Sequence, residues 1–143
     1  MWNKNKTFTY SQNIIIGDIP NNIKHVIFDS TFTLKVRIHI PQNIKHITFN
    51  GNCIPCDIPS TITKLTLGPS FVNENFIIPS TVTHLVIDSN SIPCIIPLTI
   101  THLIFGDDFN QAIKGIIPKS VKHLTINYRY NQNIEKYHIV SHI

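Results

Sequence analysis

Apolar residues recur along the chain with a period of about 20 residues, and an Ile-Pro pair marks the start of each period. The pairs begin at residues 19, 40, 58, 78, 96 and 117, so their spacings are 21, 18, 20, 18 and 21 residues. In every unit, the third, sixth and eighth residues after the proline are also apolar. Repetition of this kind indicates a chain built from stacked copies of one small unit.

The apolar positions that follow each proline have the spacing L-x-x-L-x-L, which is typical of leucine-rich repeats. Each unit would form one short strand and return by an irregular or 3-10 segment, because alternating apolar residues suit a strand buried on one side. A single coil cannot bury its apolar row without neighbours. We therefore predict a β-rich, leucine-rich-repeat-like solenoid of six stacked coils of 18–21 residues, with a parallel sheet on one face.

The repeats divide the chain of 143 residues, which has room for one domain with a substantial core, into three parts. We expect residues 19–134 to form the repeats and residues 1–18, which include a strand-like "TFTY", to form an N-terminal cap or partial repeat. Residues 135–143 are expected to form a C-terminal cap strand or tail.

Two further positions of the repeat predict how the coils pack. Twelve residues after each proline, long coils have an aromatic residue and short coils a small one, which indicates large-small packing at the outer side of the core. These residues are Phe32, Cys53, Phe71, Ser91, Phe109 and Tyr130. Directly after each predicted strand, we expect turn residues that tolerate a left-handed backbone. They are Asp29, Asn50, Gly68, Asp88, Gly106 and Asn127.

The polar positions of the predicted strands contain five of the eight histidines of the chain. In an L-x-L strand the x residues point away from the core. The first x column consists of His25, His46, Lys64, His84, His102 and His123. The second consists of Ile27, Thr48, Thr66, Val86, Ile104 and Thr125. Stacked coils would place successive members of a column about 4.8 Å apart.

Three interpretations of the histidines remain open. Flat rings that stack and hydrogen-bond along the column would be structural. The column and its Ile and Thr neighbours would alternatively form a surface for a partner protein. Neighbouring imidazoles could also bind Zn²⁺, Cu²⁺ or Ni²⁺, although Lys64 interrupts the row and no carboxylate column completes a ligand set. In each case, protonated neighbours should lower the histidine pKa values below about 6.5, so that stability falls with pH.

Composition and charge exclude several classes of protein. The net charge is +4, but Lys and Arg are scattered singly, so we expect neither nucleic acid nor a membrane surface as a partner. No apolar stretch reaches the about 18 residues of a transmembrane helix, and the first residues do not resemble a signal peptide. A reducing, cytoplasmic location is expected, and the three cysteines are compatible with it.

The cysteines and acidic residues do not form a recognisable active site. Cys53 and Cys56 make a lone C-x-x-C, and repeat register places Cys56 two coils from Cys94, so we expect buried small side chains rather than a disulfide or zinc site. The adjacent Asp107 and Asp108 lie in a predicted turn. Glycine-rich phosphate loops and nucleophile elbows are absent from the sequence, so no enzyme activity and no cofactor are predicted.

The stretch "LIFGDDFNQAIKGIIPKSVKHLTI", Leu103–Ile126, resembles the FNIP repeat. The likeness is strongest at Phe109–Ile113, where Ala112 replaces the proline usual in the family. It recurs at Tyr130–Ile134 and more weakly at Phe71–Asn73, and it spans residues 19–134. The resemblance implies a leucine-rich-repeat-like protein of the kind found in amoebae and their giant viruses, which for a viral protein means the host cytoplasm. An F-box, common in such proteins, does not fit within 18 strand-like residues, so ubiquitin-ligase recruitment is not expected.

These observations predict a non-enzymatic protein-interaction module, with a metal-binding protein as the alternative. The partner would contact the strand face, and we expect the solenoid ends to be able to pair in a homo-oligomer. The predicted contact residues are His25, Ile27, His46, Lys64, His84, Val86, His102, Ile104 and His123.

Overall fold

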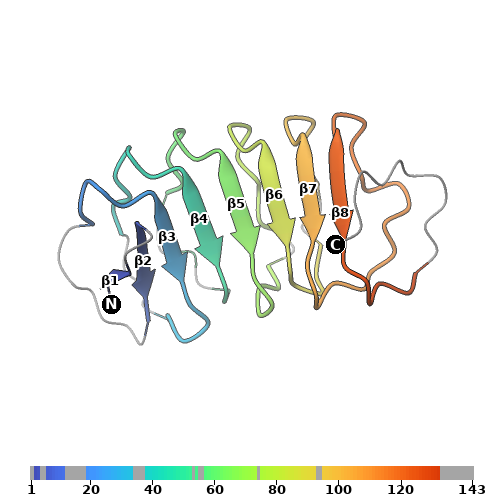
Figure 1. The fold of residues 1–143 in the computed structure, drawn as a ribbon, viewed down its shortest axis with the longest axis horizontal. Coiled ribbons are helices and arrows are strands. Elements are labelled where there is room, and N and C mark those ends of the chain that lie inside the picture. Colours follow the sequence, from blue (N-terminus) through green and yellow to red (C-terminus); the bar gives the residue numbers. More distant parts are fainter. Residues whose placement is uncertain are drawn as a thin grey trace.

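The computed structural model describes residues 2–3, 6–11, 19–33, 38–52, 54, 57–73, 75–92 and 95–132. These residues form one eight-stranded sheet whose strands follow the order of the chain (Figure 1). The strands are β1 (Trp2–Asn3), β2 (Thr7–Tyr10), β3 (His25–Phe28), β4 (His46–Phe49), β5 (Lys64–Leu67), β6 (His84–Ile87), β7 (His102–Phe105) and β8 (His123–Ile126). The described residues contain no helix.

The parallel solenoid predicted from the repeats is confirmed. Strands β3 to β8 are the six repeat strands, and each pairs in parallel with the next, without any register shift between equivalent residues. Strand β2 adds a seventh parallel strand from the predicted cap or partial repeat, with Phe8 opposite Val26 and Tyr10 opposite Phe28. Strand β1 pairs antiparallel with β2. The predicted C-terminal cap, residues 135–143, lies outside the described residues.

The core lies behind the sheet and is built from the apolar positions of the repeat. All of these residues are buried except Ile58, Ile117 and Val121, which are partly buried against the same core. Each strand buries its second and fourth residues because successive side chains point to opposite faces. The carbonyl of each Ile-Pro proline accepts a hydrogen bond from the amide three residues later, as in Ile62 N to Pro59 O at 3.0 Å. This turn directs the chain into the next strand.

Aromatic residues fill the outer side of the core. Phe32, Phe71 and Phe109 are each 1% exposed, so the predicted burial of these rings is confirmed. Cys53, which was expected as a small counterpart, lies outside the described residues. Phe76 was not predicted, but it is buried and packs edge-on against Phe71, with 5.3 Å between ring centroids.

The residues that follow the strands do form turns, but the expected left-handed backbone is wrong. Among the described residues, positive φ occurs at Lys6 and Gly115 and not at the predicted positions. Gly68 and Gly106 are needed for space instead. A Cβ on Gly106 would lie 2.0 Å from Asp88 Oδ1 in the previous coil, and one on Gly68 would lie 2.1 Å from Asn50 Oδ1. Glycine therefore alternates with larger side chains because adjacent coils approach closely here.

Amide side chains satisfy backbone N–H groups on the outer turns. Asn52 Oδ1 accepts a hydrogen bond of 2.6 Å from Val72 N, and Asn90 Oδ1 accepts one of 3.0 Å from Asn110 N. In both cases a short coil supplies the asparagine and the following long coil supplies the amide. These bonds link coils that the sheet alone would join on only one side.

Candidate functional site

The first and third residues of β3 to β8 form an open surface, the strand face. The first residues are the histidine column: His25, His46, Lys64, His84, His102 and His123. The third residues are Ile27, Thr48, Thr66, Val86, Ile104 and Thr125. Parallel pairing in register aligns both sets across the sheet. The structure therefore brings all nine predicted contact residues onto one face.

The histidines of the column stack ring on ring. The centroids of His25 and His46 are 3.6 Å apart and their planes differ by 4°. His84 and His102 are 4.1 Å apart, and His102 and His123 are 4.3 Å apart. Lys64 separates these rings into a pair, His25 and His46, and a triplet, His84, His102 and His123.

The pair is half-buried and hydrogen-bonds across the sheet. His25 Nε2 lies 2.8 Å from Thr48 Oγ1, and His46 Nε2 lies 2.9 Å from Thr66 Oγ1. Each bond joins a histidine to the third residue of the next strand. Thr48 is buried as a result, with 7% of its surface exposed.

The triplet has a different arrangement. His84 Nδ1 lies 2.9 Å from Thr83 Oγ1, and His102 Nδ1 lies 2.9 Å from Thr101 Oγ1. The sequence explains the difference, because threonine precedes these two histidines whereas lysine precedes those of the pair. Across the sheet, Ile104 stands where a threonine would face His84, so no hydroxyl is offered to His84 there.

The triplet borders a shallow hollow in the strand face. Its volume is about 110 Å³, and its lining surface is mostly apolar. The lining residues are Lys64, His84, Leu85, Val86, His102, Ile104, His123 and Thr125. Ile104 lies on the solvent-facing side of β7 and is 38% exposed. The hollow can accept a small apolar side chain between polar groups.

Burial and neighbouring charge lower the histidine pKa values. Burial, with the charge of Lys64, lowers the pKa of His25 to about 4. Burial, His25 and Lys64 together lower the pKa of His46 to about 3. The pKa of His102 is also lowered, by desolvation and then by His84, His123 and Lys122. The predicted direction is confirmed for these three, although burial exceeds the repulsion between neighbours that the sequence suggested.

The described part of the chain contains no cluster of metal ligands: no group of three or more His, Cys, Asp or Glu side chains is placed to hold an ion. Cys53, Cys56 and Cys94 lie outside the described residues.

A second surface, the Ile-Pro edge, was not predicted. It consists of the side chains just before and after each Ile-Pro pair, and its character changes along the solenoid. Towards the C-terminus it is apolar, with Ile77 83%, Ile95 73% and Leu98 65% exposed. A pocket of about 240 Å³ lies there, lined in part by Ile95, Leu98 and Ile116. Aligning the residues before each Ile-Pro pair would have found this signal.

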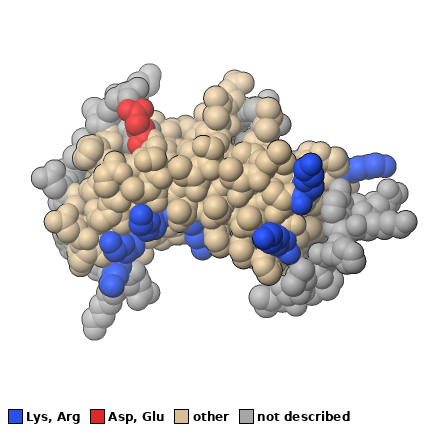
Figure 2. Space-filling model, turned by 90° about the horizontal axis from the view of Figure 1, so that it is seen from above, with Lys and Arg blue, Asp and Glu red and all other residues tan. Residues whose placement is uncertain are grey.

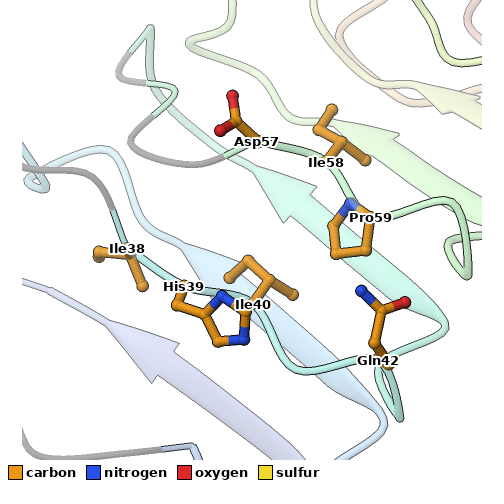
Figure 3. Close-up of a pocket in the computed structure, with 7 residues that line it drawn as sticks. All are labelled: Ile38, His39, Ile40, Gln42, Asp57, Ile58 and Pro59. Atoms are coloured by element: carbon orange, nitrogen blue, oxygen red, sulfur yellow. The ribbon is translucent and has the colours of Figure 1, made fainter.

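At the equivalent place nearer the N-terminus, the residues beside the Ile-Pro pairs are polar: His39, Gln42 and Asp57. A pocket of about 320 Å³ is lined there by Ile38, His39, Ile40, Gln42, Asp57, Ile58 and Pro59. Figure 3 shows that one coil supplies the residues from Ile38 to Gln42 and the next coil supplies Asp57, Ile58 and Pro59. The most exposed apolar side chains of this edge, Ile77, Ile95 and Leu98, thus belong to the C-terminal coils.

Within the described residues, the structure contains no helix with the length and apolar character needed to cross a membrane. The family model described as FNIP Repeat matches residues 10–52, 89–128 and 109–139 of the chain. No curated protein matches it.

Proposed function

The chain belongs to the FNIP repeat family, and we propose that it is a non-enzymatic module that binds a partner protein through its strand face. A rigid, aligned sheet can hold side chains from several coils in a fixed pattern. A partner would then contact residues that are distant in the sequence but adjacent in space.

The main support for this proposal is the hollow beside the histidine triplet. Exposed apolar side chains ringed by polar groups are typical of protein contact surfaces. Here Ile104 and Val86 contribute apolar surface to a hollow that His84, His102 and Lys64 also line. Stacking holds the histidine rings in place before binding, which reduces the entropy lost when a partner orders them.

The experiment that tests this proposal is a pull-down from cell extract with two variants, one with four substitutions on the strand face and one with three on the Ile-Pro edge. The strand-face variant is His84→Gln, Val86→Gln, His102→Gln and Ile104→Gln. The control variant is Ile77→Gln, Ile95→Gln and Leu98→Gln, which changes the exposed Ile-Pro edge instead. Glutamine introduces no charge in either variant, so a loss of binding would not be caused by new electrostatic repulsion. Circular dichroism and a melting curve establish that each variant folds.

The expected result is a partner that the wild type and the control variant recover and the strand-face variant loses. Loss of the partner in the control variant alone would assign the contact to the Ile-Pro edge. Equal recovery by all three proteins would contradict the proposal.

A further inference from the structure

Lysines lie along the start of the strands. Lys24, Lys45 and Lys122 directly precede the histidines of β3, β4 and β8, and Lys64 lies within the histidine column. All four are exposed. Lys24 Nζ donates to the Asn43 carbonyl at 3.3 Å, and within the described ranges none of the four is paired with a carboxylate. Their positive charge is therefore available to a ligand.

The described acidic residues lie away from this border. Asp29 and Asp88 follow the ends of β3 and β6, Asp107 and Asp108 lie in the turn after β7, and Asp57 belongs to the Ile-Pro edge. Figure 2 views the molecule from the side where the strands of Figure 1 begin. Most Lys and Arg side chains lie along its lower border, and the acidic group shown in red lies at the opposite border. The strand face thus has a basic margin where its strands start.

The triplet adds hydrogen-bond acceptors next to these lysines. The hydroxyl of Thr83 donates to the Thr63 carbonyl at 3.4 Å, so its oxygen is free to accept from His84 Nδ1–H. The same relation joins Thr101, the Thr83 carbonyl and His102. With the proton on Nδ1, the Nε2 atom of each neutral ring is an acceptor. Such atoms suit the backbone N–H groups of an extended peptide.

Nucleic acid fits this surface less well. Single-stranded nucleic acids bind by stacking bases on exposed aromatic faces. Within the triplet the imidazole faces cover one another, so mainly edges are offered to a ligand. Between Lys64 and Lys122 the coils carry Thr83 and Thr101 instead of lysines, so the cations beside the triplet do not form a continuous track.

We infer that the strand face binds an acidic peptide segment of a partner protein, over the surface formed by Lys64, the histidine triplet and Lys122. Carboxylates of the segment pair with the two lysines, its backbone N–H groups donate to imidazole Nε2 atoms, and one apolar side chain occupies the hollow at Val86 and Ile104. This inference rests on the proposed function and specifies the chemistry of the partner.

The test measures the affinity of the purified chain for a labelled peptide of alternating Glu and Leu by fluorescence anisotropy. An otherwise identical peptide of Gln and Leu and a single-stranded oligothymidine serve as the other probes. The variant Lys64→Gln with Lys122→Gln removes two charges from the proposed surface. The matched control, Lys119→Gln with Arg129→Gln, removes two exposed charges elsewhere.

The acidic peptide should bind more tightly than the Gln peptide, and added salt should weaken it. The strand-face variant should weaken binding about fivefold, as expected for two exposed ion pairs, and the control by less than about twofold. Equal affinity for the two peptides, no binding of the acidic peptide, or tighter binding of the oligonucleotide would overturn the inference. Recovery of a partner by the Lys64→Gln, Lys122→Gln variant in an amount equal to that of the wild type would also overturn it, while the proposed function would stand.

Discussion

Histidine occupies one position of the repeat five times, yet its surroundings give it two different roles. In the pair, each Nε2 atom is hydrogen-bonded to a threonine hydroxyl of the next strand, and the rings are half-buried. In the triplet, the preceding threonine instead binds Nδ1 of His84 and of His102. The neighbouring residues therefore decide whether a histidine stabilises the sheet or offers a polar atom to a ligand.

The pair makes stability depend on pH. The pKa values of His25 and His46 in the folded protein are about 4 and about 3, below the unfolded value of about 6.5. As pH falls below 6.5, His25 and His46 become protonated in the unfolded chain but stay neutral in the folded protein. Their contribution to the free energy of unfolding is thus complete above pH 6.5 and decreases as pH falls towards the folded pKa values. Each histidine can change the unfolding free energy by at most about 1.4 kcal/mol per pH unit, and by less where solvent screens the ring.

Urea unfolding between pH 7.5 and 4.5 checks this prediction. The variant His25→Gln with His46→Gln should lose stability less steeply than the wild type over this range. The variant His39→Gln, whose histidine lies at the Ile-Pro edge, controls for removal of a histidine outside the column. Parallel pH profiles for the wild type and the double variant would show that the pair does not titrate in this way.

At the scale of the strand and its turn, the close approach of adjacent coils limits side-chain size. A Cβ on Gly106 would lie 2.6 Å from Asp88 Cγ and 3.0 Å from Asp88 Cβ, all atoms of one side chain. Gly106→Ala should therefore lower the unfolding free energy by about 1–3 kcal/mol, the usual cost of overpacking. Denaturant unfolding measures this change.

A second substitution separates crowding from backbone effects. Asp88→Gly removes the crowding side chain, so in that background Gly106→Ala should cost much less. If the cost of Gly106→Ala is the same with and without Asp88, contact with this side chain is not its cause.

The same turns show how far the sequence determines the structure. Register could be predicted because each apolar position recurs in every unit and strands alternate with a period of two. The reason why residues 68 and 106 are glycine could not be predicted, because a left-handed backbone and a close approach of two coils both require glycine. The sequence likewise predicted the histidine column and its interruption at Lys64, but not the different hydrogen bonds of the pair and the triplet. Those of the pair depend on contacts of Thr48 and Thr66 with histidines about 20 residues earlier.

Across the whole molecule, stability should be shared between coils. The core is continuous from Phe8 to Ile126, and each strand in it pairs only with its immediate neighbours. No coil can bury its apolar row alone, so a defect in the middle weakens both halves, whereas one at an end removes only a single interface. Leu65 in β5 is fully buried between β4 and β6, and Leu124 in β8 is 4% exposed near the end of the described sheet.

Leu65→Ala should therefore reduce the unfolding free energy by about 2–5 kcal/mol, the range for a large core side chain replaced by alanine. Hydrogen exchange should show lower protection in β3 and β7 together, because loss of the central interface destabilises the stacks on both sides. Leu124→Ala should lower protection mainly in β8 and β7 and leave β3 nearly unchanged. Loss of protection confined to β4, β5 and β6 in the Leu65 variant would mean that the coils unfold independently. The strand face would then lack the rigidity across coils that binding an extended partner requires.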